Sequence, residues 1–270
     1  MKTTFIGGGN MAVALIGGMK KKGFSAAATQ VVEPSAPARA RLTEEFGVRC
    51  APAIDAAALN CEVIVLAVKP QNMREAVAPL AGKLRDQLVI SIAAGLRLAD
   101  LSRWLGNHRR VVRTMPNTPA LIGEGITALC ADPGVSEEGR QTTEKILGAV
   151  GRTLWIDDES QMDAVTAVSG SGPAYVFYFI EALEAAAREL GFNVEAARQL
   201  AIETFLGATR LAESRDEPVG LLRERVTSKG GTTEAALRSF DADRVGESIR
   251  RGIHAAAARG RELGELLGKG

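Results

Sequence analysis

The chain has 270 residues, of which 46% are hydrophobic and 24% charged, and its formal net charge is +1. This length suits one large or two modest domains, and the composition is that of a soluble globular protein. The chain has neither a basic tract nor an acidic tail, and its longest strongly apolar run is far shorter than the roughly 20 residues that cross a bilayer, so the sequence predicts no nucleic-acid or membrane partner.

A dinucleotide-binding turn is predicted at the start of the chain. Residues 3–6 form a short apolar strand, followed by Gly7-Gly8-Gly9-Asn10-Met11-Ala12 and a helix to about Lys22. In this G-x-G-x-x-A pattern the first glycine makes the turn, and Gly9 lets a pyrophosphate approach the backbone. The small Ala12 allows close packing of helix and strand. Because the pattern follows a strand and opens a helix, it predicts a dinucleotide site.

The second predicted strand, at 30–33, carries conflicting signals about the cofactor. Glu33 stands where an acidic residue would accept the ribose 2′-hydroxyl of NAD. Ser35, Arg39 and Arg41 follow closely and could instead contact the 2′-phosphate of NADP. A solvated helix face is the alternative reading of the two arginines.

Two further apolar strands are predicted to border the cofactor. Residues 61–68 form a near-continuous apolar run, typical of a central parallel strand, and end in Lys69-Pro70. Residues 88–92 repeat the theme and lead into Ala93-Ala94-Gly95. Ligands of open α/β sheets collect at the carboxyl ends of strands, so Val68 and both of these segments are expected beside the cofactor.

The loop that follows a predicted strand at 110–113 contains two prolines and Asn117. The prolines fix the loop, and the Asn117 amide offers both a donor and an acceptor. We expect Asn117 to line the nicotinamide pocket.

Two domains of different character are predicted. Further strands at 125–130 and 152–156 flank a helix at 136–150, which completes a doubly wound α/β domain of the Rossmann type over residues 1–157. Residues 158–270 have helical periodicity and form an all-α domain.

The first long helix of the second domain is expected at 174–190, after the interruption Ser169-Gly170-Ser171-Gly172-Pro173. Its apolar residues lie on all sides, which is typical of a fully buried helix. A domain as small as residues 158–270 has few ways to surround such a helix alone. A partner subunit is therefore predicted to cover it. The remaining helices are expected at 194–213, 219–225, 233–239 and 245–267.

The stretch 226–233, Val-Thr-Ser-Lys-Gly-Gly-Thr-Thr, is predicted to be a tight turn between two of these helices. Ser228 is a good N-cap residue, and the two glycines allow positive φ. Backbone N–H groups at the following helix N-terminus, with the hydroxyls of Ser228, Thr232 and Thr233, would form a nest for a carboxylate or phosphate. An ordinary capped turn is the alternative.

The remaining reactive side chains give no metal or disulfide signal. Cys50, Cys61 and Cys130 lie in apolar settings without CxxC spacing, as expected of buried thiols in a reducing, cytoplasmic compartment. His108 and His254 lack metal-ligand spacing, so no metal site is predicted.

The chain resembles the pyrroline-5-carboxylate reductase family over essentially its whole length. The resemblance rests on the turn at 226–233 and on five other segments, which are Gly7–Ala12, Ala67–Pro70, Ala93–Gly95, Met115–Pro119 and Ser169–Ala174. It implies reduction of L-1-pyrroline-5-carboxylate to L-proline, the last step of proline biosynthesis, with NADPH or, alternatively, NADH. It also implies a homodimer formed by intertwined C-terminal helices, and assembly of five dimers into a decamer as an open expectation.

The resemblance also implies roles for individual residues. Thr233 falls near the substrate ring nitrogen as the catalytic residue, and Glu159 borders the proline site. The other substrate positions are Ser228, Gly230, Gly231 and Thr232. The cofactor positions are Gly7, Gly8, Gly9, Asn10, Met11, Pro34, Ser35, Val68, Lys69, Pro70, Ala93, Ala94, Gly95 and Asn117. Two departures from the family pattern are Lys229, in place of a common proline, and Ile54, where some relatives have an asparagine that contacts the cofactor.

The chemistry of this reduction separates it from two alternatives. Imine reduction needs the carboxylate held and the nitrogen oriented, but no strong base. A β-hydroxyacid dehydrogenase would need a lysine on the long interdomain helix, and no lysine lies between Lys145 and Lys229. A non-catalytic redox sensor that binds NAD(P) would not need the ordered turn at 226–233.

Overall fold

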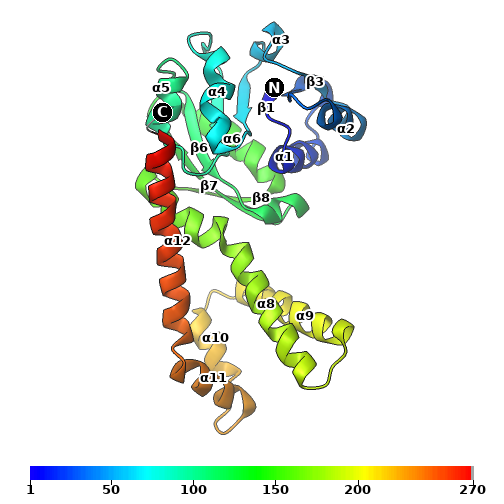
Figure 1. The fold of residues 1–270 in the computed structure, drawn as a ribbon, viewed down its shortest axis with the longest axis vertical. Coiled ribbons are helices and arrows are strands. Elements are labelled where there is room, and N and C mark those ends of the chain that lie inside the picture. The colour runs from blue at the N-terminus through cyan, green and yellow to red at the C-terminus, as the bar shows by residue number, and fades with distance from the viewer. Residues whose placement is uncertain (269–270) are drawn as a thin grey trace. The chain divides into compact units, whose positions relative to one another are not determined.

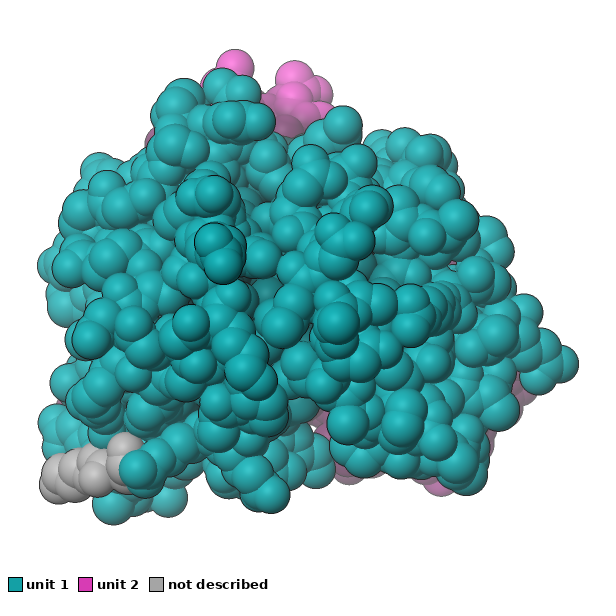
Figure 2. Space-filling view, turned by 90° about the horizontal axis from the view of Figure 1, so that it is seen from above, with its two compact units in different colours: residues 1–171, 256–270 teal, residues 172–255 magenta. Residues whose placement is uncertain are grey.

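The computed structural model describes residues 1–268, and its chain divides into two compact units (Figures 1 and 2). Unit 1 comprises Met1–Ser171 together with the residues from Ala256 onward, and unit 2 comprises Gly172–Ala255. The sequence places the boundary at 157, where the last strand ends. Unit 1 extends further because the helical segment after that strand packs on the sheet, and because the end of the last helix belongs to it.

Unit 1 is built on one eight-stranded sheet in the order β3-β2-β1-β4-β5-β6-β7-β8. The first six strands are parallel, β7 runs antiparallel to β6, and β8 is parallel to β7. The strands are β1 (Thr3–Ile6), β2 (Thr29–Val32), β3 (Arg49–Ala51), β4 (Val63–Leu66), β5 (Leu88–Ser91), β6 (Val111–Met115), β7 (Gly125–Ala131) and β8 (Gly151–Trp155). This arrangement confirms the predicted Rossmann-type fold class and adds β3, which the sequence analysis did not predict.

Helices cover both faces of this sheet (Figure 1). They are α1 (Asn10–Lys21), α2 (Ala36–Phe46), α3 (Ala56–Leu59), α4 (Met73–Val77), α5 (Leu98–Trp104), α6 (Glu137–Leu147) and α7 (Met162–Val165). Adjacent strand residues enter different cores, as Phe5 and Ile6 do, because successive side chains point to opposite faces. One core packs against α1, α2 and α6, and the other against α4, α5 and α7.

All regular secondary structure of unit 2 is helical. They are α8 (Gly172–Glu189), α9 (Val194–Glu213), α10 (Val219–Arg225), α11 (Thr232–Ala242) and the first part of α12 (Val245–Gly268). Asn193 caps α9 through its side chain, which accepts a hydrogen bond from Ala196 N, and Gly191 adopts φ +101° after α8. The bounds of α9 and α10 match those predicted from the sequence.

Helix α8 has no buried residue within the chain, although its sequence is typical of a helix buried on all sides. The side chains of Phe177 and Tyr178 are 65% and 70% exposed. The single chain therefore does not cover this helix. Among the described residues, no helix is both long and apolar enough to traverse a bilayer.

Candidate active site

The glycine turn after β1 lies at the point where the strand order reverses, between β1 and β4. Gly7 adopts φ +101°, and a Cβ built on it would lie 2.6 Å from the carbonyl oxygen of Ala67, which follows β4. Gly9 is the N-cap of α1 without a side-chain cap, and a Cβ there would meet open space. The first N–H groups of α1 are thus free to bind an anion at the end of the sheet where ligands collect.

Glu33 joins this turn to the segment that follows β2. Its Oε2 accepts a hydrogen bond from Gly8 N at 2.9 Å, and its Oε1 accepts one from Ser35 N at 2.9 Å. Arg39 Nη1 donates to the carbonyl oxygens of Glu33 and Pro34 at 2.7 and 2.6 Å. The Glu33 carboxylate and the Arg39 guanidinium therefore already have partners within the chain, which neither reading of the sequence anticipated.

A cavity of about 770 Å³ opens beside this turn. Six of the predicted cofactor residues line it, namely Gly7, Gly8, Gly9, Pro34, Val68 and Lys69, as does Ile54. The other predicted cofactor residues are not among its lining residues; they are Asn10, Met11, Ser35, Pro70, Ala93, Ala94, Gly95 and Asn117. A glycine turn with uncapped helix N–H groups beside an open cavity fits the pyrophosphate of a dinucleotide.

Several residues of this cavity were not predicted from the sequence. They are Pro52, Ala53, Asn72, Glu75, Ala76 and Pro79. Pro52 and Ala53 follow β3, a three-residue edge strand whose pattern of exposure gives no clear periodicity. Asn72 directly precedes α4, Glu75 and Ala76 lie in it, and Pro79 follows it. Their position shortly after Lys69-Pro70 is the only signal of them in the sequence.

The Asn117 side chain is not a free amide, because it hydrogen-bonds to strand β7 and to the helical turn that follows α7. Its Oδ1 accepts a hydrogen bond from Ile126 N at 2.9 Å, and its Nδ2 donates to the Ser169 carbonyl at 3.1 Å. Ser169 belongs to a π-helical turn at Thr166–Gly170, and a Cβ on Gly170 would lie 2.5 Å from Met115 Cε. The predicted nicotinamide contact would thus compete with hydrogen bonds that hold this region together.

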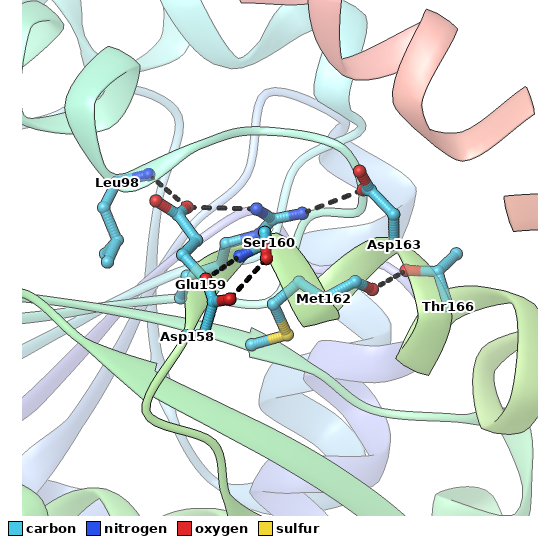
Figure 3. Close-up of polar contacts among 8 residues, drawn as sticks. Leu98, Asp158, Glu159, Ser160, Met162, Asp163 and Thr166 are labelled. Atoms are coloured by element: carbon cyan, nitrogen blue, oxygen red, sulfur yellow. Dashed lines mark hydrogen bonds and ion pairs between the residues drawn. The ribbon is translucent and has the colours of Figure 1, made fainter. Parts of the chain in front are cut away.

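Glu159 lies in an ion-pair cluster around the buried Arg113 (Figure 3). Glu159 Oε1 accepts from Arg113 Nη1 at 3.0 Å and from Leu98 N at 2.7 Å. Arg113 Nη2 lies 3.6 Å from Asp163 Oδ1, and Arg113 is only 4% exposed. The Leu98 amide is the first of helix α5, so a carboxylate there is favoured by the helix dipole. The cluster joins β6, α5 and α7.

Asp158 neighbours this cluster but has its own partner. It accepts hydrogen bonds from Ser160 Oγ at 2.6 Å and from Ser160 N at 2.8 Å. These two bonds, the hydroxyl first, lower the pKa of Asp158 below its usual value. Asp158 is therefore a charged cap on the turn that carries Glu159.

The turn at 226–233 connects α10 to α11 within unit 2. Gly230 adopts φ +73°, as the predicted turn requires, and Gly231 N donates to the Ser228 carbonyl at 2.9 Å. The N-cap of α11 is Gly231, without a side-chain cap, so the prediction that Ser228 caps this helix is wrong. The turn inserts three residues between Ser228 and the first helical residue, too far for its hydroxyl to reach the N2 or N3 amide as a cap.

The α11 N-terminus consequently keeps donors for a ligand. The N–H groups of Thr232, Thr233 and Glu234 have no acceptor within an α-helix, because they belong to its first turn. Glu234 turns its own carboxylate back to accept from Gly230 N at 2.6 Å, and Arg238 donates to it at 3.2 Å. The turn thus already holds one carboxylate, and the three amides beyond it remain available for a second.

The cysteines form no disulfide, and Cys130 is the one that is fully buried. Cys50 and Cys61 are half-buried, so the expectation of three buried thiols is too strong. Burial raises the pKa of the Cys61 and Cys130 thiols, which keeps them protonated at neutral pH.

Two family models match the chain. The model described as pyrroline-5-carboxylate reductase dimerisation matches residues 159–263, and the model described as NADP oxidoreductase, coenzyme F420-dependent, matches residues 2–95.

Individual proteins match over nearly the full length. The chain is 45% identical to pyrroline-5-carboxylate reductase of Pseudomonas aeruginosa over 99% of this chain and 98% of that one. A solved pyrroline-5-carboxylate reductase of Coxiella burnetii is 38% identical, with a TM-score of 0.91 over 97% of this chain and 98% of its own. The Plasmodium falciparum pyrroline carboxylate reductase structure with NADP bound is 29% identical, with a TM-score of 0.88 over 98% of both chains.

Proposed function

The chain belongs to the pyrroline-5-carboxylate reductase family, and from this premise we propose how its residues reduce 1-pyrroline-5-carboxylate to proline with NADPH. The enzyme is an NADP-dependent oxidoreductase of proline biosynthesis, with NAD as an alternative cofactor. The observation that carries the proposal for its substrate site is the turn at 226–233, whose following helix begins with no side-chain cap.

The substrate is a cyclic imine that bears a carboxylate. In this proposal the free amides of Thr232, Thr233 and Glu234 hold that carboxylate, and Lys229 adds positive charge nearby. The Thr233 hydroxyl forms a hydrogen bond with the ring nitrogen and orients the imine carbon. A bound NADPH supplies the hydride that this carbon receives. The protonated nitrogen already activates the carbon, so no side chain has to act as a strong acid.

The cofactor is assigned to the cavity beside β1 and β4. The glycine turn and the first amides of α1 would hold the pyrophosphate, and Lys69 would lie beside it. Pro34 and Ser35 would meet the adenosine ribose, and the loop Ala93–Gly95 would lie along the nicotinamide side. Ser35 is the N-cap of α2, so a 2′-phosphate there would face a helix N-terminus.

A direct assay tests this function. We expect the purified protein to oxidise NADPH when 1-pyrroline-5-carboxylate is added, and to leave NADP⁺ unchanged when 3-hydroxy acids are added. Turnover of only the hydroxy acids would favour a β-hydroxyacid dehydrogenase instead. Binding of NADPH without turnover of either substrate would favour a redox sensor.

Glu33 is predicted to set the balance between the two cofactors. Its carboxylate repels a 2′-phosphate, so Glu33→Ala should raise the ratio of kcat/KM for NADPH over NADH by about tenfold. Both absolute values should fall, because Gly8 N and Ser35 N lose their acceptor. Steady-state kinetics with both cofactors measure the ratio, and Glu44→Ala on the exposed side of α2 is the control. An unchanged ratio would remove Glu33 from cofactor selection.

The functional unit is proposed to be a homodimer formed through the C-terminal helices, with five dimers in a decamer. The exposed apolar residues of α8 support this, as does an apolar groove of about 400 Å³ lined by Tyr175, Phe179, Val245 and Ile249, among others. Sedimentation analysis gives the number of copies. We also propose that the enzyme acts in the cytoplasm, which suits its free cysteines.

A further inference from the structure

The last turns of α12 meet the loop after β5 backbone to backbone, and both belong to unit 1. Gly264 is buried, and a Cβ built on it would lie 2.9 Å from the Gly95 carbonyl oxygen. A Cβ on Gly95 would in turn lie 3.7 Å from Gly264 N and 3.6 Å from Leu267 Cδ1. Because neither glycine has a side chain, the backbones of the helix and the loop are in direct contact. The position of one backbone therefore determines that of the other.

The end of α12 lies beside α5 (Figure 1), and side-chain contacts hold it there. Arg103, on α5, donates from Nη2 to the Gly268 carbonyl at 2.8 Å, and the same Nη2 lies 3.0 Å from Asp100 Oδ1. Leu267 packs against the core that α5 helps to form. Helix α12 is therefore bound to α5, and α5 is the helix that follows the Ala93–Gly95 loop.

The loop held in this way begins at the carboxyl end of β5, the edge of the sheet to which the cofactor is assigned in the proposed function. Ala93 follows the carboxyl end of β5, is buried, and donates from its N–H to Ser91 Oγ at 3.4 Å. Gly95 adopts φ +79°, a conformation that side chains with a Cβ rarely adopt. We infer that Gly264 is a positioning residue for NADPH. Through Gly264, helix α12 contacts the Ala93–Gly95 loop and holds it in place, and the nicotinamide lies against this loop. The inference rests on the proposed cofactor assignment of that loop.

Gly260 offers a matched comparison on the same helix. It lies one turn before Gly264, and a Cβ there would lie 3.8 Å from Asp163 Cβ, an ordinary van der Waals distance. Replacement by alanine at either position gains the same helix propensity. At Gly264 alone the added methyl must displace a carbonyl oxygen of the loop.

The test compares Gly264→Ala with Gly260→Ala in the full-length enzyme. We expect Gly264→Ala to raise the Kd for NADPH, measured by fluorescence titration, about 5- to 20-fold, since displacements near 1 Å weaken aligned contacts strongly. The KM for 1-pyrroline-5-carboxylate should stay within about twofold of the wild-type value. Gly260→Ala should leave both constants unchanged.

Arg103→Gln provides a second approach to the same contact. This side chain is 55% exposed, so its loss should leave the fold intact while it frees the Gly268 carbonyl. A smaller rise of about two- to fourfold in the NADPH Kd is expected. Wild-type NADPH affinity in Gly264→Ala would overturn the inference, whatever Arg103→Gln shows, and so would an equal loss for NADPH and substrate accompanied by a lower Tm.

The control for the underlying assignment is the wild-type enzyme itself. If it fails to oxidise NADPH with 1-pyrroline-5-carboxylate, the proposed function fails. If it is active and Gly264→Ala binds NADPH normally, only the positioning role of Gly264 fails.

Discussion

Replacing Thr233 by alanine should lower kcat/KM for 1-pyrroline-5-carboxylate by roughly one to three orders of magnitude, the scale of one lost preorganised hydrogen bond. Thr233 is the second residue of α11, in the turn whose amides lack acceptors. Its backbone N–H survives the substitution, so the carboxylate contact should persist and the loss should fall on orientation of the ring nitrogen. The Kd for NADPH should stay within about twofold.

Two companion variants make this result specific. Thr233→Ser keeps the hydroxyl and should recover most of the activity. Ser239→Ala removes an exposed hydroxyl from the same helix and should behave as wild type. Wild-type kinetics in Thr233→Ala would remove the hydroxyl from the mechanism, and a Thr233→Ser variant as slow as Thr233→Ala would point to packing of the threonine methyl group.

Replacing Arg113 by methionine should lower the free energy of unfolding by about 3–5 kcal/mol, because it leaves carboxylates near the sheet without their cation. Arg113 is 4% exposed and lies 3.0 Å from Glu159 and 3.6 Å from Asp163. Methionine fills a similar length of apolar space, so the cost should come mainly from the lost charge. For a chain of this size a drop in Tm of roughly 10 °C or more is expected.

A triple variant separates the effect of charge from that of packing. Arg113→Met combined with Glu159→Gln and Asp163→Asn removes the unpaired charges and should recover part of the lost stability. Thermal unfolding measures the stability of both variants. The protein concentration is kept fixed, because the Tm of an oligomer rises with concentration. A loss below about 1 kcal/mol in Arg113→Met would show that the ion-pair cluster contributes little to stability.

The elements with strong local signals could be predicted from the sequence. The helix at 194–213 has Asn193 as an N-cap before it and helical periodicity throughout, and its bounds agree with the structure. The parallel strands β1, β2, β4 and β5 are rich in apolar residues, and a glycine or proline follows each of them within a few residues, which marks them clearly. The position of the glycine turn at a strand end followed from the same signals.

Features that depend on distant partners could not be predicted in this way. Strand β3 has three residues and one partner strand, so no periodicity reveals it. The direction of β7 depends on a short connection that returns it antiparallel to its neighbour β6, and β8 runs parallel to β7 because α6 connects the two strands. Arg113 occupies the end of a predicted strand, but its ion-pair partner Glu159 follows 46 residues later. Likewise Ser228 is a residue type that often caps helices, but the backbone path through Gly230 makes Gly231 the N-cap of α11 instead.

The two hydrogen bonds of Glu33 affect how the coenzyme preference of this enzyme can be redesigned. An acidic residue at this position favours the ribose 2′-hydroxyl of NAD over the 2′-phosphate of NADP, so it is the first residue to replace when coenzyme preference is to be changed. In this chain that exchange would also disconnect the glycine turn from the segment after β2. A successful conversion should therefore pair any replacement of Glu33 with a compensating acceptor for Gly8 N, and libraries that vary position 33 alone should yield weakened catalysts of altered preference.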